Sequence, residues 1–270
     1  MIILIPILVC LVIAVVCAAI LTLTSHFFSV PVDETEEKIR ECLAGANCGA
    51  CGYSGCDGYA KALAEGTCTK TNLCTPAGAP GAKQISEILG VEAETVVEQI
   101  AYVACNGNCN ALPKRYIYQG SRSCKIANMS YAGDKMCTYA CLGYGDCANV
   151  CPNDAITVVN GVAIVDSKKC IGCGLCAKTC PKKMIHLISD GERAIVACSN
   201  HDKGAVTKKT CSNGCIGCGL CKKNCPSEAI TIENNLAVIN YEKCVKCGKC
   251  AEVCPVGCLK ETCFIVAEKK

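Results

Sequence analysis

Cysteines at metal-binding spacing dominate this sequence, in which 31 of 270 residues are cysteine. Three runs share the pattern Cys-x2-Cys-x2-Cys-x3-Cys-Pro, the bacterial-ferredoxin signature for [4Fe–4S] clusters. Three closely spaced thiolates can bind three corners of one cubane, while the fourth serves the neighbouring cluster. The runs are Cys170, Cys173, Cys176 and Cys180; Cys215, Cys218, Cys221 and Cys225; and Cys244, Cys247, Cys250 and Cys254.

These runs belong to an internal repeat with an offset of 74 residues. Each cysteine of the region 137–180 has a counterpart 74 residues later, beginning with Cys137 and Cys211. Between the runs, residues 155–165 and 229–239 have alternating apolar residues around an Asn-Gly or Asn-Asn pair, which predicts a β-hairpin in each copy. The sequence therefore predicts two tandem modules that resemble bacterial ferredoxins.

Crossing the fourth ligand between the runs of each module predicts three clusters. Their ligands are Cys215, Cys218, Cys221 and Cys254; Cys225, Cys244, Cys247 and Cys250; and Cys151, Cys170, Cys173 and Cys176.

The first run of the first module lacks one ligand, because Tyr144 stands where the second module has Cys218. Cys137 is the nearest replacement, which predicts a fourth cluster on Cys137, Cys141, Cys147 and Cys180. The alternative is a three-iron cluster without that corner, with Cys137 unused like its counterpart Cys211.

Nearer the N-terminus, Cys48, Cys51 and Cys56 lie among glycines, and either Cys68 or Cys74 can complete a further cluster. This makes five expected clusters. A sixth is possible on the remaining cysteines, for which small buried apolar residues are the rival interpretation. The candidates are Cys105, Cys109, Cys124 and Cys198.

Zinc and disulfides are the other uses of closely spaced cysteines. Zinc sites commonly pair two Cys-x2-Cys units or recruit histidine, and the three histidines here have no ligand spacing. Disulfides require an oxidising compartment. The Cys-Pro quartets favour iron–sulfur chemistry.

The elements that must hold these cysteines give an α+β fold in six parts. Met1 to Val32 contain no Asp, Glu, Lys or Arg, and about 20 apolar residues suffice for a transmembrane helix. A cleaved signal peptide is the rival reading, but no positive region precedes the apolar stretch. The expected parts are an anchor at 1–30, a small helical 4Fe–4S domain at 31–104, a Cys-containing connector at 105–136, ferredoxin-like module 1 at 137–190, a connector at 191–210 and ferredoxin-like module 2 at 211–270.

The apolar spacing over residues 82–103 predicts core-facing helices in the 31–104 part. Lysine and arginine follow the apolar stretch and none precedes it, so we expect a single-pass protein of the cell (inner) membrane with its bulk in the reducing cytoplasm.

Charge separates the two halves of the chain. The net charge of +3 and the absence of a long basic run exclude a nucleic-acid partner. From Cys137 onward, 17 Lys/Arg face 12 Asp/Glu, whereas residues 33–136 have 10 against 12. The basic half predicts a docking face for an acidic ferredoxin, and the simpler interpretation is a solvated surface that offsets the clusters' charge.

The order of these motifs resembles the B-subunit family of Rnf complexes over essentially the whole chain. The resemblance lies in the Asn-Cys-Gly-Ala-Cys-Gly-Tyr-Ser-Gly-Cys box at 47–56, in Cys-Thr-Tyr-Ala-Cys-Leu-Gly-Tyr-Gly-Asp-Cys at 137–147 and in the ferredoxin-like modules. It implies that Cys74, which precedes Thr-Pro-Ala-Gly, closes the N-terminal cluster, and that Cys137 is a regular ligand. Shorter members lack the second module and the cysteines at 105, 109 and 124.

The family resemblance implies a membrane-bound ferredoxin:NAD⁺ oxidoreductase that couples electron flow to Na⁺ or H⁺ translocation. This iron–sulfur component would take electrons from soluble reduced ferredoxin, which agrees with clusters that act as one-electron carriers. No nucleotide-binding motif occurs here, so we expect flavin and NAD on other subunits and no complete active site on this chain. The alternatives are an iron–sulfur subunit of a different membrane oxidoreductase and a metal-storing or sensing module.

Overall fold

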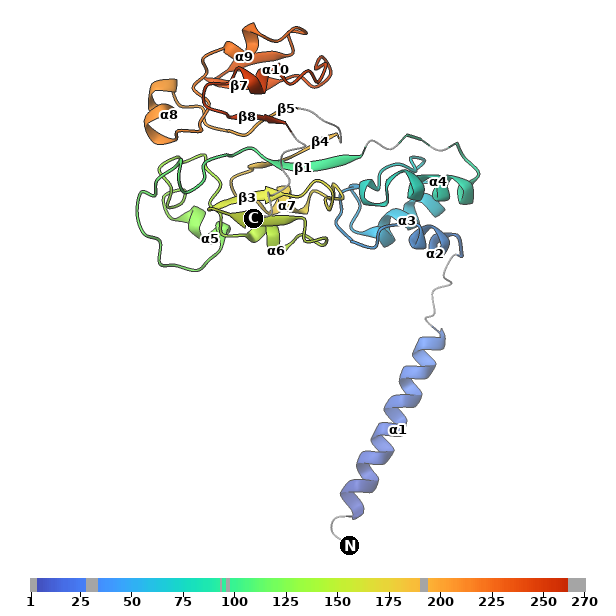
Figure 1. Ribbon diagram of the computed structural model, residues 1–270. Helices are drawn as coiled ribbons and strands as arrows, with labels where there is room; N and C mark the ends of the chain where they lie inside the picture. The colour runs from blue at the N-terminus through green and yellow to red at the C-terminus, as the bar shows by residue number, and fades with distance from the viewer. Residues whose placement is uncertain (1–3, 28–33, 93, 96–97, 190–193, 262–270) are drawn as a thin grey trace.

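The computed structural model describes residues 4–27, 34–92, 94–95, 98–189 and 194–261 (Figure 1). Helix α1 (Leu4–Phe27) extends away from the rest of the chain, and its side chains are described for residues 11–24. Within the described part of the chain, no helix is long and apolar enough to cross a membrane. The anchor predicted at residues 1–30 is therefore not confirmed.

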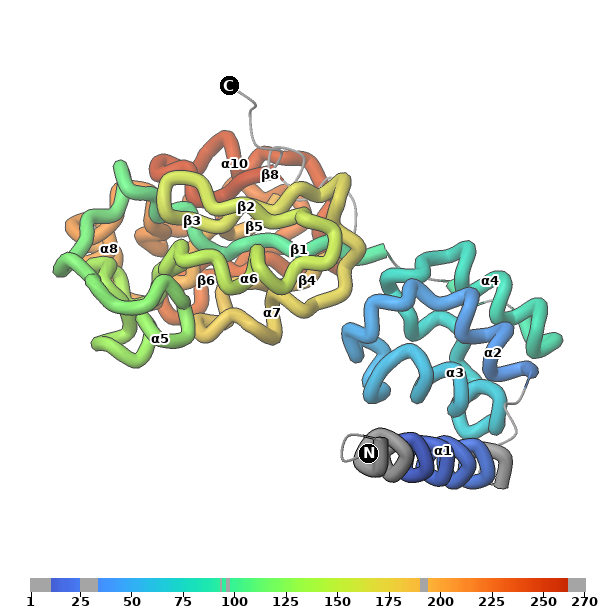
Figure 2. The backbone as a smooth tube through the Cα atoms, turned by 90° about the horizontal axis from the view of Figure 1, so that it is seen from below, coloured from blue at the N-terminus to red at the C-terminus, as the bar shows by residue number. Residues whose placement is uncertain are grey.

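A small helical lobe follows and lies beside the larger body of the molecule (Figure 2). Its core is formed by Ile39, Tyr59, Leu63 and Ile85, each 2 % exposed or less. The Tyr59 hydroxyl donates a hydrogen bond of 2.6 Å to the Lys70 carbonyl and so ties the last part of the cysteine-rich loop to this core. The elements of the lobe are α2 (Glu34–Glu41), α3 (Cys56–Ala64), the 3₁₀ turn η1 (Thr75–Ala77) and α4 (Gly78–Leu89).

The helical prediction for residues 82–103 is only partly confirmed. Helix α4 ends at Leu89, where Gly90 adopts the left-handed conformation of a helix C-cap. Residues Gln99–Val103 instead form strand β1, so the helical prediction is wrong there. The physical reason is tertiary, because β1 pairs antiparallel with β4 (Ile185–Ser189) of module 1 and its apolar side chains pack on that module.

Both predicted hairpins are confirmed. In module 1, β2 (Ile156–Val159) pairs with β3 (Val162–Val165), and the turn places Asn160 and Gly161 at φ 48° and 76°. Positive φ at both central residues is the type I′ pattern that favours Asn-Gly. In module 2, β6 (Ile230–Glu233) pairs with β7 (Leu236–Ile239) around Asn234 and Asn235.

Each module also pairs its last strand with a strand that precedes the module in sequence. In module 1 these are β4 and β1; in module 2, β8 (Leu259–Glu261) pairs with β5 (Ala194–Val196). The two modules lie one above the other, with the β1–β4 layer at their junction (Figure 1). Four short helices each contain one cysteine of a run: α6 (Asp146–Asn149), α7 (Leu175–Thr179), α9 (Leu220–Lys223) and α10 (Lys249–Glu252). Two others lie in the connectors: α5 (Cys124–Met129) and α8 (Gly204–Thr210).

Candidate iron–sulfur sites

Two cavities are surrounded by cysteine sets that the crossed spacing predicts. The first has a volume of about 330 Å³ and the second about 290 Å³. The sets are Cys151, Cys170, Cys173 and Cys176, called here the Cys151 quartet, and Cys215, Cys218, Cys221 and Cys254, called the Cys254 quartet.

A third cavity, of about 360 Å³, contains a cysteine that the spacing did not assign to it. Its thiols come from Cys124, Cys141, Cys147 and Cys180, called here the Cys124 quartet. Burial, together with the charges of Cys141, Cys124 and Cys180, raises the pKa of the Cys147 thiol to about 12. The structure therefore does not bring Cys137 to this set. Helix α5, in the connector, supplies Cys124 where the repeat lacks a counterpart of Cys218.

Cys137 lies instead at a fourth cavity, of about 310 Å³, between the two modules. Its other cysteines are Cys105, Cys198 and Cys211, and we call these four the bridging quartet. Burial, together with the charges of the other three thiols, raises the pKa of Cys137 to about 12. The extra set expected from sequence is therefore split: Cys105 and Cys198 meet here, Cys124 lies at the third cavity, and Cys109 is exposed.

The bridging quartet takes two cysteines from each module's half of the chain. Cys137 and Cys211 are repeat counterparts, and Cys105 and Cys198 each follow the strand that pairs with the last strand of a module. The Cys105 sulfur accepts hydrogen bonds from the Gly107 and Cys141 amides, at 3.4 Å each. The Cys198 sulfur accepts the matching pair from Asn200 and Cys215, at 3.5 and 3.3 Å. The two repeats thus contribute matching groups to the site.

Sequence reasoning missed Cys211 because it has no Cys-x2-Cys neighbour. The 74-residue repeat did contain an indication of this site, because Cys137 and Cys211 are counterparts in the two copies. A symmetric pair of thiols, one from each repeat, is the pattern expected for a site between the repeats.

The remaining set of module 2, Cys225, Cys244, Cys247 and Cys250, lies at the outer end of that module. Burial of Cys250, together with the charges of Cys244 and Cys247, raises the pKa of its thiol to about 11. Cys247 and, in the Cys254 quartet, Cys218 are exposed. This end of module 2 therefore presents cysteine sulfur at the surface.

The helical lobe gathers Cys51, Cys56 and Cys74 around its core, with Cys56 and Cys74 each 8 % exposed. Burial raises the pKa of Cys74, and the charges of Cys56 and Cys51 add to the shift. Cys68 also packs against this core, with its sulfur 3.7 Å from the Lys70 carbonyl oxygen.

Cys48, the first cysteine of the box, lies at the boundary with module 1. Its charge contributes to the raised pKa of Cys173 in module 1. The Lys178 ammonium of α7 donates to the Cys48 and Gly49 carbonyls at 3.4 and 3.1 Å.

A fifth cysteine reaches the Cys254 quartet. Cys258 is 1 % exposed, and its sulfur lies 3.7 Å from that of Cys254. Its hydrogen bond lowers the pKa of Cys254 to about 5 and that of Cys215 to about 6, while its own pKa is raised. Cys258 stands four residues after Cys254. Four residues after the cysteines of the other three Cys-Pro pairs stand Ala155, Met184 and Ala229, each of which donates only its backbone amide to the sulfur of that cysteine.

The thiols and amides around the four cavities fit an iron–sulfur cluster. Each of the four is lined by four or more thiols. Backbone amides point at the sulfurs, as is favourable around a negative iron–sulfur core. Among the described residues, no group of three or more His, Cys, Asp or Glu could hold a single metal ion. The thiols surround volumes instead of converging on a point.

Comparison with known proteins agrees with this donor set. Residues 169–230 and 214–258 match the "4Fe-4S dicluster domain" families, residues 43–76 match "Putative Fe-S cluster", and residues 134–190 match "LdpA Fe-S cluster-binding domain". The B subunit of the Na⁺-translocating ferredoxin:NAD⁺ oxidoreductase complex of Acetobacterium woodii is 39 % identical over 91 % of this chain and 76 % of its own length. This chain belongs to the B-subunit family of Rnf complexes.

Two more members of this Rnf family extend the comparison. The B subunit of the proton-translocating complex of Clostridium ljungdahlii is 38 % identical over 92 % of this chain and 89 % of its own length. The B subunit of the ion-translocating oxidoreductase complex of Methanosarcina acetivorans is 35 % identical over 87 % of this chain and 89 % of its own length. The family resemblance inferred from the sequence motifs is therefore confirmed.

Proposed function

We propose that this chain is the electron-transfer subunit of a membrane-bound ferredoxin:NAD⁺ oxidoreductase coupled to Na⁺ or H⁺ translocation. It accepts electrons from reduced ferredoxin and passes them toward the other subunits, which bind flavin and NAD. The observation that carries this proposal is the succession of cysteine sets joined by contacts from the Cys254 quartet of module 2 to Cys48 of the helical lobe. A [4Fe–4S] cluster, when bound, supplies one-electron carriage without substrate chemistry.

Six cysteine sets would hold these clusters, one more than the five expected from spacing. Five are the Cys151, Cys254, Cys124 and bridging quartets and the Cys225 set (Cys225, Cys244, Cys247, Cys250). The sixth is the N-terminal set, for which we assign Cys48, Cys51, Cys56 and Cys74. The burial of Cys74 beside Cys51 and Cys56 supports Cys74 over Cys68.

Contacts between the sets support an order for the path. The Cys215 amide donates to Cys198, which links module 2 to the bridging quartet, and the Cys141 amide donates to Cys105, which links that quartet to module 1. Inside module 1, the charge of Cys176 contributes to the raised pKa of Cys147, which links the Cys151 quartet to the Cys124 quartet. The contact between Lys178 and the Cys48 loop then joins module 1 to the N-terminal set.

We place ferredoxin at the outer end of module 2. Exposed lysines flank the exposed Cys218 and Cys247 in the sequence, and Val245, two residues before Cys247, is 61 % exposed. A basic rim around an apolar centre suits an acidic electron donor. The lysines are Lys222, Lys223, Lys243, Lys246 and Lys249.

We also propose that residues 1–30 anchor the chain in the cell membrane with its bulk in the cytoplasm. The support is the absence of charged residues from Met1 to Val32. The helical lobe, which follows this segment, would then lie nearest the membrane and the other subunits. The ferredoxin end would be the most distant from it.

Iron and acid-labile sulfide analysis tests the count. Full-length protein reconstituted without oxygen should bind about 24 irons and about 24 sulfides, four of each per cysteine set. A value near 20 would remove the sixth set. Metal without sulfide would end the electron-transfer proposal.

Charge reversal tests the docking face. The double variant Lys222→Glu, Lys223→Glu should slow reduction by ferredoxin roughly tenfold at low salt, with a smaller effect at high salt, because exposed charges steer association and salt screens them. Stopped-flow reduction at several ionic strengths measures this. The matched control is Lys83→Glu on α4, an exposed lysine on the helical lobe, which should leave the rate unchanged. Equal rates for all three proteins would contradict the assignment.

A further inference from the structure

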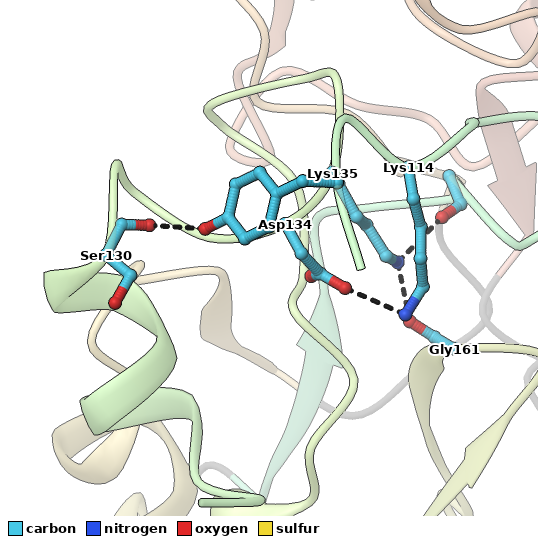
Figure 3. A network of polar contacts seen from close by, with 7 residues as sticks. Lys114, Ser130, Asp134, Lys135 and Gly161 are labelled. Atoms are coloured by element: carbon cyan, nitrogen blue, oxygen red, sulfur yellow. Dashed lines mark hydrogen bonds and ion pairs between the residues drawn. The ribbon is translucent and has the colours of Figure 1, made fainter. Parts of the chain in front are cut away.

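A buried lysine lies where the bridging quartet meets module 1. Lys135 is 4 % exposed, although it stands only two residues before Cys137. Its ammonium donates to the Gly161 carbonyl at 2.6 Å and to the Gly107 carbonyl at 3.1 Å (Figure 3). Lysine is almost never buried to this extent without a partner for its charge.

The neighbouring carboxylate does not supply that charge. Asp134 is 1 % exposed and points toward Lys114, with which it forms an ion pair of 2.8 Å (Figure 3). Within the part of the chain that the structure describes, Lys135 forms no ion pair with a carboxylate. A buried ammonium held by two neutral carbonyls still lacks a countercharge, which is costly in the interior of a protein.

Thiols of two different quartets lie within the electrostatic reach of Lys135. The two sets meet at Cys105, because the Cys105 sulfur of the bridging quartet accepts the amide of Cys141, a member of the Cys124 quartet, at 3.4 Å. Lys135 is tied to this contact, because the Gly107 residue that accepts from Lys135 donates its own amide to the Cys105 sulfur. One cation therefore faces both quartets.

We propose that Lys135 is the shared countercharge of the bridging and Cys124 quartets and raises the reduction potential of both centres relative to the rest of the path. The inference rests on the proposed function, since the negative charge that it balances is that of thiolate-bound iron–sulfur centres. Net charge near such a centre is one determinant of its potential. Each reduction adds one negative charge, and a fixed positive charge nearby makes that addition more favourable.

Lys135 would therefore act through its charge, by stabilising the electron on the two centres at the junction between the modules. Stabilising the electron there favours forward transfer out of module 2. Lys182 lies on the same boundary, near Cys137 and Cys180, but it is only partly buried and solvent screens its charge more strongly. The larger effect therefore belongs to Lys135.

Redox titration of the full-length, reconstituted chain followed by EPR tests this role. The signals of the two centres are first identified by their loss in Cys124→Ala and Cys211→Ala. Lys135→Met, which removes the charge, should retain its iron but lower the ratio of reduced to oxidised centre at a fixed potential by on the order of tenfold, a shift of about 59 mV for one electron. Lys135→Arg should keep the wild-type potentials.

The exposed Lys208 on α8 gives the matched control, since Lys208→Met removes the same charge from the surface and should shift neither signal. If Lys135→Met loses iron, Lys135→Gln keeps a neutral hydrogen-bond donor in its place, and its potentials then decide. Unchanged potentials in a neutral variant with full iron content would overturn the countercharge. Absence of both signals from the wild-type protein would overturn the proposed function instead.

Discussion

Replacing Cys211 with alanine should remove about four irons per chain and slow electron transfer from ferredoxin to the N-terminal set by at least an order of magnitude. Cys211 is 7 % exposed and lines the cavity between the modules with Cys105, Cys137 and Cys198. This quartet contacts Cys215 on one side and Cys141 on the other. Loss of its centre should leave module 2 reducible while the helical lobe stays oxidised.

Iron analysis, EPR and stopped-flow reduction by ferredoxin measure these effects together. The N-terminal signal is identified by its loss in Cys56→Ala. Cys137→Ala should reproduce the Cys211→Ala spectrum, because both thiols belong to one site. The control is Cys109→Ala, an exposed cysteine outside the four cavities. If Cys137→Ala and Cys211→Ala changed different signals, the bridging quartet would be refuted.

The second large effect concerns Cys124. We expect Cys124→Ala to lose the centre held with Cys141, Cys147 and Cys180, because the three remaining thiols leave one iron without a ligand. Loss of about one to four irons per chain, with a changed EPR signal, would be observed. A spectrum identical to that of the wild-type protein would contradict the assignment of Cys124.

A compensating substitution makes this test sharper. Tyr144 occupies the repeat position of Cys218, and the flanking glycines match, with Gly143 and Gly145 at positive φ like Gly217 and Gly219. The loop backbone that places Cys218 at its cavity is therefore present around residue 144. We expect Cys124→Ala, Tyr144→Cys to recover the lost irons. The single variant Tyr144→Cys should keep the wild-type iron content, which separates rescue from a general gain of metal.

The repeat made much of the fold predictable. Hairpins at 156–165 and 230–239 follow from local alternation and from Asn-Gly or Asn-Asn turns, which act within a few residues of sequence. Strand β1 could not be predicted in this way. Its apolar spacing also fits a helix, and only the pairing of Ile100 with Ile188 in β4 makes it a strand.

The same distinction holds for the sites. The spacing of one run identifies three ligands of each ferredoxin-like quartet, because these ligands are neighbours in sequence. The ferredoxin pattern takes the fourth ligand from the other run of the module, as it does for Cys151 with the run at 170–176. Proximity in sequence also placed Cys137 in the same cluster as Cys141, and there it was misleading. Cys137 and Cys141 belong to different cavities although they are four residues apart.

By itself, the sequence determined the chemistry of this protein: many thiols in ferredoxin spacing, two repeated modules and the resemblance to the B-subunit family of Rnf complexes. Only the tertiary structure decided how the modules are connected, since Cys105, Cys137, Cys198 and Cys211 come from distant segments that meet when β1 and β5 pair with the last strands of the two modules. The burial of Lys135 between two quartets is also a result of the tertiary structure alone. Local spacing encodes a loop that can bind a cluster, whereas a site between repeats exists only after the repeats have packed together.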